Sequence, residues 1–187
     1  MNGLAARAHD DAPVIVVMGV SGCGKSTLAK WLAVHFGLTL IEADDHHSAA
    51  NRAHMAAGLA LTDAMREPFV RSLCRAIGSE LGGCVVAFSA LRRTHRQRLR
   101  ALGRPLLFLH LDIDRSRAEQ QLRARRGHFM PASLVNSQFD ALESADGEPD
   151  VQILPVDASA SELARRAILR IEPFLQQRFD ALGGAAP

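Results

Sequence analysis

The nine residues Gly19–Thr27, GVSGCGKST, constrain the fold of this chain more than any other stretch. Their glycines, lysine and serine match the pattern G-x-x-x-x-G-K-[ST], which average composition produces by chance in about one chain of this length in a hundred. The β-branched run 14–18, VIVVM, precedes the stretch, and apolar residues at helical spacing follow it, namely Leu28, Leu32 and Phe36. The order is therefore strand, loop and helix.

A loop of this kind is suited to a polyphosphate. Its glycines let consecutive backbone N–H groups face an anion, and the following helix directs its positive end at the same place. Lys25 would then reach the β- and γ-phosphates, and the Ser26 hydroxyl would be a ligand of Mg²⁺. We expect ATP and Mg²⁺ to bind here. The predicted nucleotide contacts are Gly19, Ser21, Gly22, Cys23, Gly24, Lys25, Ser26 and Thr27.

Length and composition indicate one soluble domain. The chain has 187 residues, a formal net charge of +2 and no apolar run that approaches the roughly 18 residues of a membrane span. Its first 12 residues have no apolar core and do not resemble a signal peptide, so residues 1–12 and 181–187 are expected to be flexible tails. The three cysteines lack metal-ligand spacing, which favours reduced thiols in the cytoplasm.

Five short apolar runs alternate with helical patterns, which predicts an α/β fold with a doubly wound parallel sheet. The runs span residues 14–18, 38–41, 84–88, 106–111 and 151–156. Ligands of such sheets bind beyond the carboxyl ends of the strands, so Glu42 and Asp44 should lie beside the phosphate-binding loop. The alternative for these acids is a surface turn that caps the next helix.

Further candidates lie on predicted helices. Residues 47–57 would place His47 and Asn51 on one side of a helix. A helix with Thr62 or Asp63 as its N-cap has an apolar stripe at Phe69, Leu73, Ile77 and Leu81, with Arg66 one turn above it. Arg92 and Arg96 are four residues apart and are predicted to share a helix face, where they either bind an anion or form a solvated surface.

The many arginines favour an anionic partner, but not specifically nucleic acid. The chain has no tyrosine and no aromatic residues interleaved with its arginines, so stacking platforms for bases are missing from the sequence. The stretch 125–131, RRGHFMP, combines basic residues with a glycine and a proline and is typical of a movable lid.

In four blocks the sequence resembles the bacterial P-loop gluconokinase family, which is related to shikimate kinase and the nucleoside monophosphate kinases. The blocks are MGVSGCGKST at 18–27, the pattern AD..H...N...M..G..LTD..R.P at 43–68, SALRR at 89–93 and RRGHFMPASLVNSQFDALE at 125–143. The last block is the most distinctive, because the phosphate-binding loop alone identifies only a superfamily.

This resemblance implies transfer of the γ-phosphate of ATP to the 6-hydroxyl of D-gluconate. It implies a single domain over residues 1–187, sheet order 2-3-1-4-5, a substrate-binding helical insert at 43–69 and a lid at 123–142. By the same resemblance Asp44 acts as base, Glu42 lies near Mg²⁺ and Arg125 neutralises charge on the transferred phosphoryl group. The acceptor contacts that we expect are Asp44, His47, Asn51, Arg66, Arg92, Arg96, His128 and Gln138.

Two other functions remain open from the sequence. The chain departs from the family pattern mainly inside the insert, at Ala43, Ser48, His54, Met65 and Phe69, so another small sugar acid or polyol is an alternative acceptor. A nucleotide-binding switch protein is the alternative outside enzymes. The family resemblance also suggests a homodimer, with a small-molecule substrate and with neither nucleic acid nor membrane as a partner.

Overall fold

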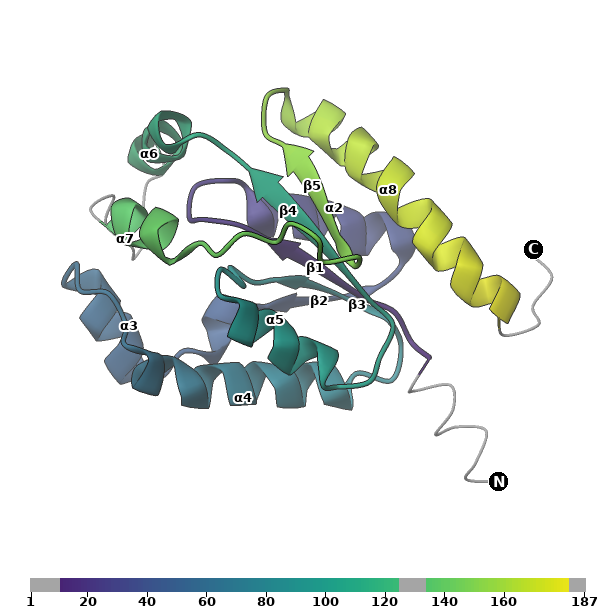
Figure 1. Ribbon diagram of the computed structural model, residues 1–187, viewed down its shortest axis with the longest axis horizontal. Coiled ribbons are helices and arrows are strands. Elements are labelled where there is room, and N and C mark those ends of the chain that lie inside the picture. The colour runs from purple at the N-terminus through teal and green to yellow at the C-terminus, as the bar shows by residue number, and fades with distance from the viewer. Residues whose placement is uncertain (1–10, 125–133, 182–187) are drawn as a thin grey trace.

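The computed structural model describes residues 11–124 and 134–181 of the chain (Figure 1). Its elements are β1 (Val14–Met18), α2 (Lys25–Phe36), β2 (Thr39–Glu42), the 3₁₀ turn η1 (Ala43–His46), α3 (Ala49–Ala56), α4 (Asp63–Ser79), β3 (Cys84–Ala87), α5 (Arg93–Arg100), β4 (Leu106–Asp112), α6 (Arg115–Ala124), α7 (Leu134–Ala141), β5 (Val151–Pro155) and α8 (Ala160–Ala181).

The strands form one parallel sheet in the order β2-β3-β1-β4-β5, which confirms the predicted fold. Strand β1 lies at the centre, paired with β3 on one side and β4 on the other. All five of its residues are fully buried, because both faces of the sheet are covered. This explains why its sequence is a continuous apolar run rather than an alternating one.

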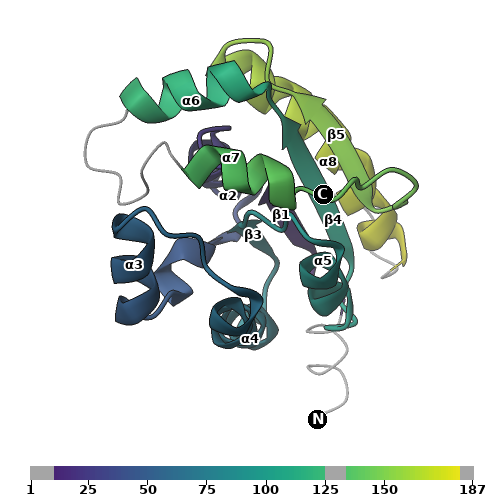
Figure 2. The same ribbon diagram turned by 60° about the vertical axis from the view of Figure 1, so that its left-hand side comes forward.

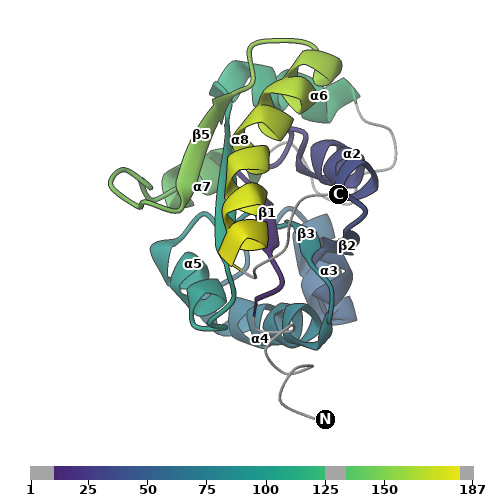
Figure 3. The ribbon, with the colours of Figure 1, turned by 90° about the vertical axis from the view of Figure 1, so that its right-hand side faces the viewer.

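Helices cover the two faces of the sheet as separate layers (Figures 1 and 3). Alternate residues of β1 belong to two cores: Ile15 and Val17 pack with α2 and α8, whereas Val14 and Val16 pack with α4 and α5. The carboxyl ends of the strands point toward α3, α6 and α7, which Figure 2 shows grouped on one side of the chain. No helix in the described ranges is long and apolar enough to cross a membrane.

Two predicted helix limits are wrong in ways that affect the site. Helix α3 begins at Ala49 rather than at His47, because residues 43–46 form a 3₁₀ turn and the Ser48 hydroxyl accepts a hydrogen bond from the backbone N–H of Asn51. Helix α5 begins at Arg93. Arg92 precedes it in an extended conformation (φ −92°, ψ 143°), so Arg92 and Arg96 do not share a helix face.

The predicted stripe of α4 is confirmed at Phe69, Leu73 and Ile77, which are buried in the core. Leu81 lies beyond the last residue of the helix and is 74% exposed. At the N-terminal limit of the described chain, the buried Arg104 donates a hydrogen bond to the carbonyl of Ala12. The rest of the predicted tails, residues 1–10 and 182–187, lies outside the described ranges.

Candidate active site

The phosphate-binding loop connects β1 to α2, and its backbone shape depends on glycine. Gly24 precedes α2 at φ 98°, a left-handed conformation that other residues rarely adopt. Gly22 also has a positive φ, and a Cβ there would lie 2.6 Å from the carbonyl oxygen of Ala118 in α6. The loop therefore packs directly against the helix that leads into the predicted lid.

Within this loop, Lys25 is the first residue of α2 and its Nζ donates a hydrogen bond to the Val20 carbonyl at 3.0 Å. This hydrogen bond holds the ammonium group against the loop. A phosphate bound by the loop would offer Lys25 a negatively charged acceptor in place of a neutral carbonyl, and so would add the attraction of opposite charges to the hydrogen bond.

Ser26 and Glu42 meet beside the loop, where their oxygens fit a hard divalent cation. The Ser26 hydroxyl donates to Glu42 Oε2 at 3.0 Å, although the residues belong to α2 and the end of β2. Burial raises the pKa of the Glu42 carboxyl, and the nearby Asp44 and Asp45 add to this, whereas the Ser26 hydrogen bond opposes it. A hydroxyl and a half-buried carboxylate are ligands of the kind that Mg²⁺ takes, directly or through water.

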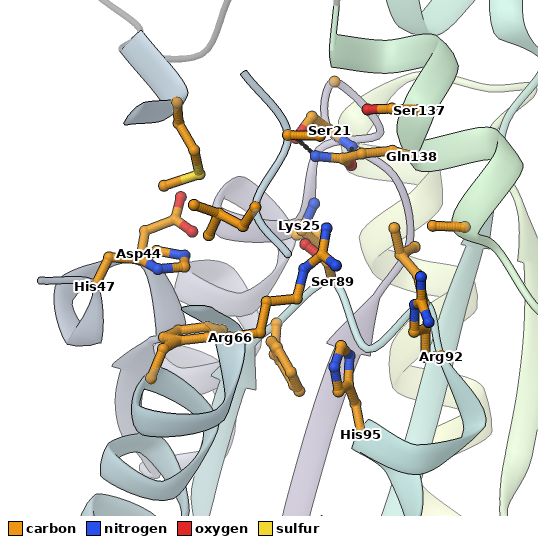
Figure 4. Close-up of a pocket in the computed structure, with 18 of the residues that line it drawn as sticks. Ser21, Lys25, Asp44, His47, Arg66, Ser89, Arg92, His95, Ser137 and Gln138 are labelled. Carbon is orange, nitrogen blue, oxygen red and sulfur yellow. Dashed lines mark hydrogen bonds between the residues drawn. The ribbon is translucent and has the colours of Figure 1, made fainter. Parts of the chain in front are cut away.

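One pocket brings the loop together with most of the predicted acceptor residues (Figure 4). Lys25, Asp44 and Arg92 come from the segments that directly follow β1, β2 and β3. Helix α4 supplies Arg66, and α7 supplies Gln138. In Figure 4, Asp44 and His47 lie on one side, Arg92 and His95 on the other, and Arg66 between them. The donor loop and the acceptor residues thus face the same cavity.

An aromatic floor, defined as His47, Phe69, Phe88 and His95, runs under this pocket. His47 stacks on Phe69 with ring centroids 3.8 Å apart, Phe69 meets Phe88 edge-on at 5.7 Å, and Phe88 lies 5.8 Å from His95. Burial lowers the pKa of both histidines, and for His95 the neighbouring Arg66 and Arg92 lower it further. Burial therefore favours the uncharged form of both rings, and the flat rings of the floor suit the carbon chain of a polyol.

Two polar atoms in this region are buried without a hydrogen-bond partner in the described chain, His47 Nδ1 and Arg92 Nε. Leaving a buried polar group unpaired costs about 1–3 kcal/mol, so such atoms commonly mark places where a ligand supplies the partner. Both residues line the pocket.

Gln138 joins α7 to the phosphate-binding loop. Its Oε1 accepts the backbone N–H of Ser21 at 2.7 Å, and its Nε2 donates to the Ser21 hydroxyl at 2.9 Å. Figure 4 shows this pair at the edge of the pocket. Gln138 therefore connects the C-terminal part of the lid segment to the nucleotide loop, a contact that sequence reasoning missed. Its contact with the acceptor stays a prediction.

Several predicted residues lie elsewhere. Arg96 is fully buried, and its guanidinium bonds Glu148 and the carbonyls of Ala90, Leu91, Glu143 and Ser144, so the structure does not bring it to the acceptor pocket. Asn51 is also buried, and its Nδ2 donates to the Met65 carbonyl at 2.9 Å, which fixes α3 against the start of α4. Both residues hold the walls of the site.

The remaining predictions divide between the loop and the lid. Gly19 and Cys23 are buried residues of the loop itself, whereas Thr27 is exposed on α2. Arg125 and His128 lie outside the described residues. Sequence reasoning missed His95 and Ser137 as pocket residues. For His95 the available signal was its place in the first turn of α5, the helix that follows β3, because ligands bind beyond the carboxyl ends of the strands.

Comparisons with known proteins agree with this geometry. Residues 14–149 match the family model described as "AAA domain". The gluconokinase of Gluconobacter oxydans is 42% identical over 144 residues, covering 74% of this chain and 80% of the relative. The thermosensitive gluconokinase of Escherichia coli is 34% identical and covers 91% of this chain and 94% of its own. A solved gluconokinase from Sinorhizobium meliloti superposes with a TM-score of 0.81 at 32% identity, over 92% of this chain and 98% of that chain.

Proposed function

This chain belongs to the gluconokinase family of P-loop kinases, and we propose that it transfers the γ-phosphate of ATP to the 6-hydroxyl of D-gluconate. The product would be 6-phospho-D-gluconate. Action in the cytoplasm, assembly as a homodimer and the absence of a nucleic-acid partner stay predictions from the sequence.

The observation that carries this proposal is the shared pocket. Lys25 and Ser26 of the phosphate-binding loop line the same cavity as Asp44, Arg66 and Arg92. The Asp44 carboxylate lies on one side, the Arg92 guanidinium on the other and Arg66 between them, which fits an acceptor with a hydroxyl at one end and a carboxylate at the other. The aromatic floor between them would support the carbon chain.

Each side would have its own role in the reaction. Asp44 would accept a hydrogen bond from the 6-hydroxyl, orient it toward the γ-phosphate and take up its proton. Arg66 and Arg92 would hold the carboxylate and fix the distance of the hydroxyl from the loop. Lys25 would neutralise charge on the transferred group. When bound at Ser26 and Glu42, Mg²⁺ would supply further positive charge beside the β- and γ-phosphates.

Incubation of the purified protein with ATP, Mg²⁺ and D-gluconate tests the proposal, with ADP release and mass spectrometry of the sugar acid as readouts. Lys25→Ala and Asp44→Asn should each lower kcat by about 10²-fold or more, because both groups act on the transition state. Lys30→Ala, on the exposed side of α2, is the matched control and should leave kcat unchanged.

Other results would contradict separate parts of the proposal. Turnover of a different sugar acid without turnover of gluconate would overturn the acceptor and leave the kinase. Near-normal turnover by Asp44→Asn would overturn its role as base. Salt-dependent binding of RNA or DNA without any kinase activity would favour the nucleotide-binding switch instead.

A further inference from the structure

Asp63, the first residue of α4, joins the two arginines of the acceptor pocket. Its Oδ1 accepts a hydrogen bond from Arg66 Nη1 at 3.1 Å, and its Oδ2 accepts one from Arg92 Nη1 at 2.9 Å. Arg66 and Arg92 are 26 positions apart in the sequence, and the Asp63 carboxylate links their guanidinium groups. Asp63 itself is mostly exposed, with 65% of its side-chain surface accessible.

The charges of this group add up to one positive unit. Arg66 and Arg92 contribute two positive charges and Asp63 removes one. His95 lies in the same part of the pocket, where burial and the two neighbouring arginines lower its pKa and so favour its uncharged form. Arg92 Nε is buried and has no partner among the described residues, which leaves a donor for an oxygen of the ligand.

We propose that Asp63 determines which anion the acceptor pocket selects, favouring a singly charged carboxylate over a doubly charged phosphate on the same carbon. The inference rests on the proposed function, because it takes Arg66 and Arg92 as the groups that hold the acceptor's anion. Sugar phosphates are chemically close to sugar acids and carry the same hydroxyl chain. A kinase that phosphorylates a sugar acid therefore gains selectivity from a pocket whose net charge matches the carboxylate.

Asp63 acts on a ligand in two separable ways. It fixes the positions of the two guanidinium groups, which affects anions of similar size about equally. It also repels bound negative charge, and this effect grows in proportion to the charge of the ligand. The ratio of two affinities, for a dianion and a monoanion, cancels the first effect and retains the second.

The experiment measures dissociation constants by isothermal titration calorimetry at pH 8 and constant ionic strength. The ligands are D-gluconate with one negative charge, D-glucitol 1-phosphate with two, and uncharged D-glucitol. In Asp63→Asn the affinity for the phosphate should rise relative to that for gluconate by about tenfold, as expected for one unit charge acting across a partly solvated site. D-Glucitol should show no such gain.

Two control variants separate charge from position. Asp63→Glu keeps the charge and moves the carboxylate, so it should weaken both anions by similar factors and leave the ratio unchanged. Glu67→Gln removes a carboxylate one turn further along α4 that pairs with Arg71 and Arg98, and it should also leave the ratio unchanged. Thermal unfolding of each variant verifies that the protein is folded.

The outcomes distinguish this inference from the proposed function. If the wild-type protein phosphorylates gluconate but Asp63→Asn leaves the affinity ratio unchanged, the inference is overturned and the function stands. If gluconate is not phosphorylated but the ratio shifts as expected, the function is overturned and the charge selection stands. An equal shift of the ratio in Asp63→Glu would also overturn the inference, since that variant retains the negative charge.

Discussion

The structure contains two groups of arginines and carboxylates that are built differently. One includes Arg92, which precedes α5, and the other includes Arg96, which lies within α5. The pocket arginines, Arg66 and Arg92, share the single carboxylate of Asp63. The buried arginines, Arg96 and Arg100, share Glu148 and Asp150. Arg92 and Arg96 are four positions apart in the sequence, yet the Arg92 side chain is 37% exposed and the Arg96 side chain is fully buried.

The difference lies in how completely the donors are satisfied. Arg96 bonds Glu148 at 2.6–3.2 Å through two nitrogens, and its remaining donors reach the carbonyls of Ala90, Leu91, Glu143 and Ser144. Arg92 retains a buried Nε without a partner in the described chain. Saturated donors hold a structure in place, whereas unsaturated donors remain available to a ligand.

The carbonyls that Arg96 binds show what the buried arginines hold. Ala90 has a left-handed backbone (φ 46°), a conformation that costs a non-glycine residue of order 1–3 kcal/mol and needs support from its surroundings. Ala90 and Leu91 connect two residues of the pocket wall, Ser89 and Arg92. Glu143 and Ser144 follow α7, which carries Gln138. Arg96 therefore positions the acceptor loop against the segment that returns from the lid.

The largest effect should come from removing Arg96. Arg96→Leu leaves the carbonyls of Ala90, Glu143 and Ser144 and part of the Glu148 carboxylate without their Arg96 donor, whereas the Leu91 carbonyl keeps the N–H of Glu143. Loss of one partner of a buried ion pair costs about 3–5 kcal/mol. We expect a fall of that size in the free energy of unfolding, measured with urea. Arg98→Ala, on the exposed side of the same helix, is the matched control and should change it little.

A double-mutant cycle would sharpen this result. Combining Arg96→Leu with Glu148→Leu removes both charges, so the double variant should be more stable than the sum of the single losses predicts. Additive losses would contradict the assignment of Arg96 and Glu148 as a coupled buried pair.

The next largest effect should come from acid, which protonates Glu148 and weakens its hydrogen bonds with the buried arginines. The Arg96 hydrogen bonds, followed by those of Arg100, lower the pKa of Glu148 from 4.5 to about 2 in the folded protein. The unfolded chain binds this proton first as the pH falls, so the contribution of Glu148 to stability is complete above pH 4.5 and is lost between pH 4.5 and about 2. Urea unfolding of wild type and Glu148→Gln across that range measures it.

Glu148→Gln should be less stable than wild type at pH 7, and the gap between the two should narrow as the pH falls below 4.5. Other carboxylates titrate in both proteins, so only the difference between them is informative. A gap that stays constant with pH would mean that Glu148 contributes through packing rather than through its charge.

The phosphate-binding loop and the five strands were predictable from the sequence because each is encoded by a local pattern. The loop has its glycines and lysine, and the strands are short apolar runs. The two arginine groups show where such local patterns fail. Arg92 and Arg96 seemed equivalent because they are four residues apart. The structure separates them because α5 begins at Arg93, and a helix start is encoded weakly when no Ser, Thr, Asp or Asn precedes it.

The partner of Arg96 was not predictable from local sequence. Glu148 is 52 residues away, within a polar stretch that reads as a connection between elements. Asp63 was considered only as the cap of α4, and its contact with Arg92 spans 29 residues. Long-range pairing of this kind depends on the packed sheet, which local patterns do not specify.

Arg92→Ala should affect binding rather than folding. Loss of a charge-assisted hydrogen bond to the acceptor costs about 1.5–3 kcal/mol, so KM for gluconate should rise by about 10- to 150-fold. The free energy of unfolding should stay within about 0.5 kcal/mol of wild type, as is usual for a surface substitution. Arg93→Ala is the control for KM, because Arg93 does not line the pocket and pairs instead with Glu148 at 3.5 Å. A loss of stability like that of Arg96→Leu would remove the distinction between the two groups.

The smallest effect is expected at Glu67, whose arginine partners belong neither to the pocket arginines nor to the buried arginines. Glu67 lies on α4 and pairs with Arg71 at 3.2 Å and with Arg98 at 2.8 Å, but all three side chains are at least 36% exposed. Water screens such pairs, so Glu67→Gln should change the free energy of unfolding little and leave KM unchanged. Because Glu67 bonds as many arginines as Asp63 does, this variant tests whether position in the fold decides the effect. A rise in KM like that of Arg92→Ala would show that any carboxylate on α4 acts on the pocket, and that Asp63 and the pocket arginines hold no special place.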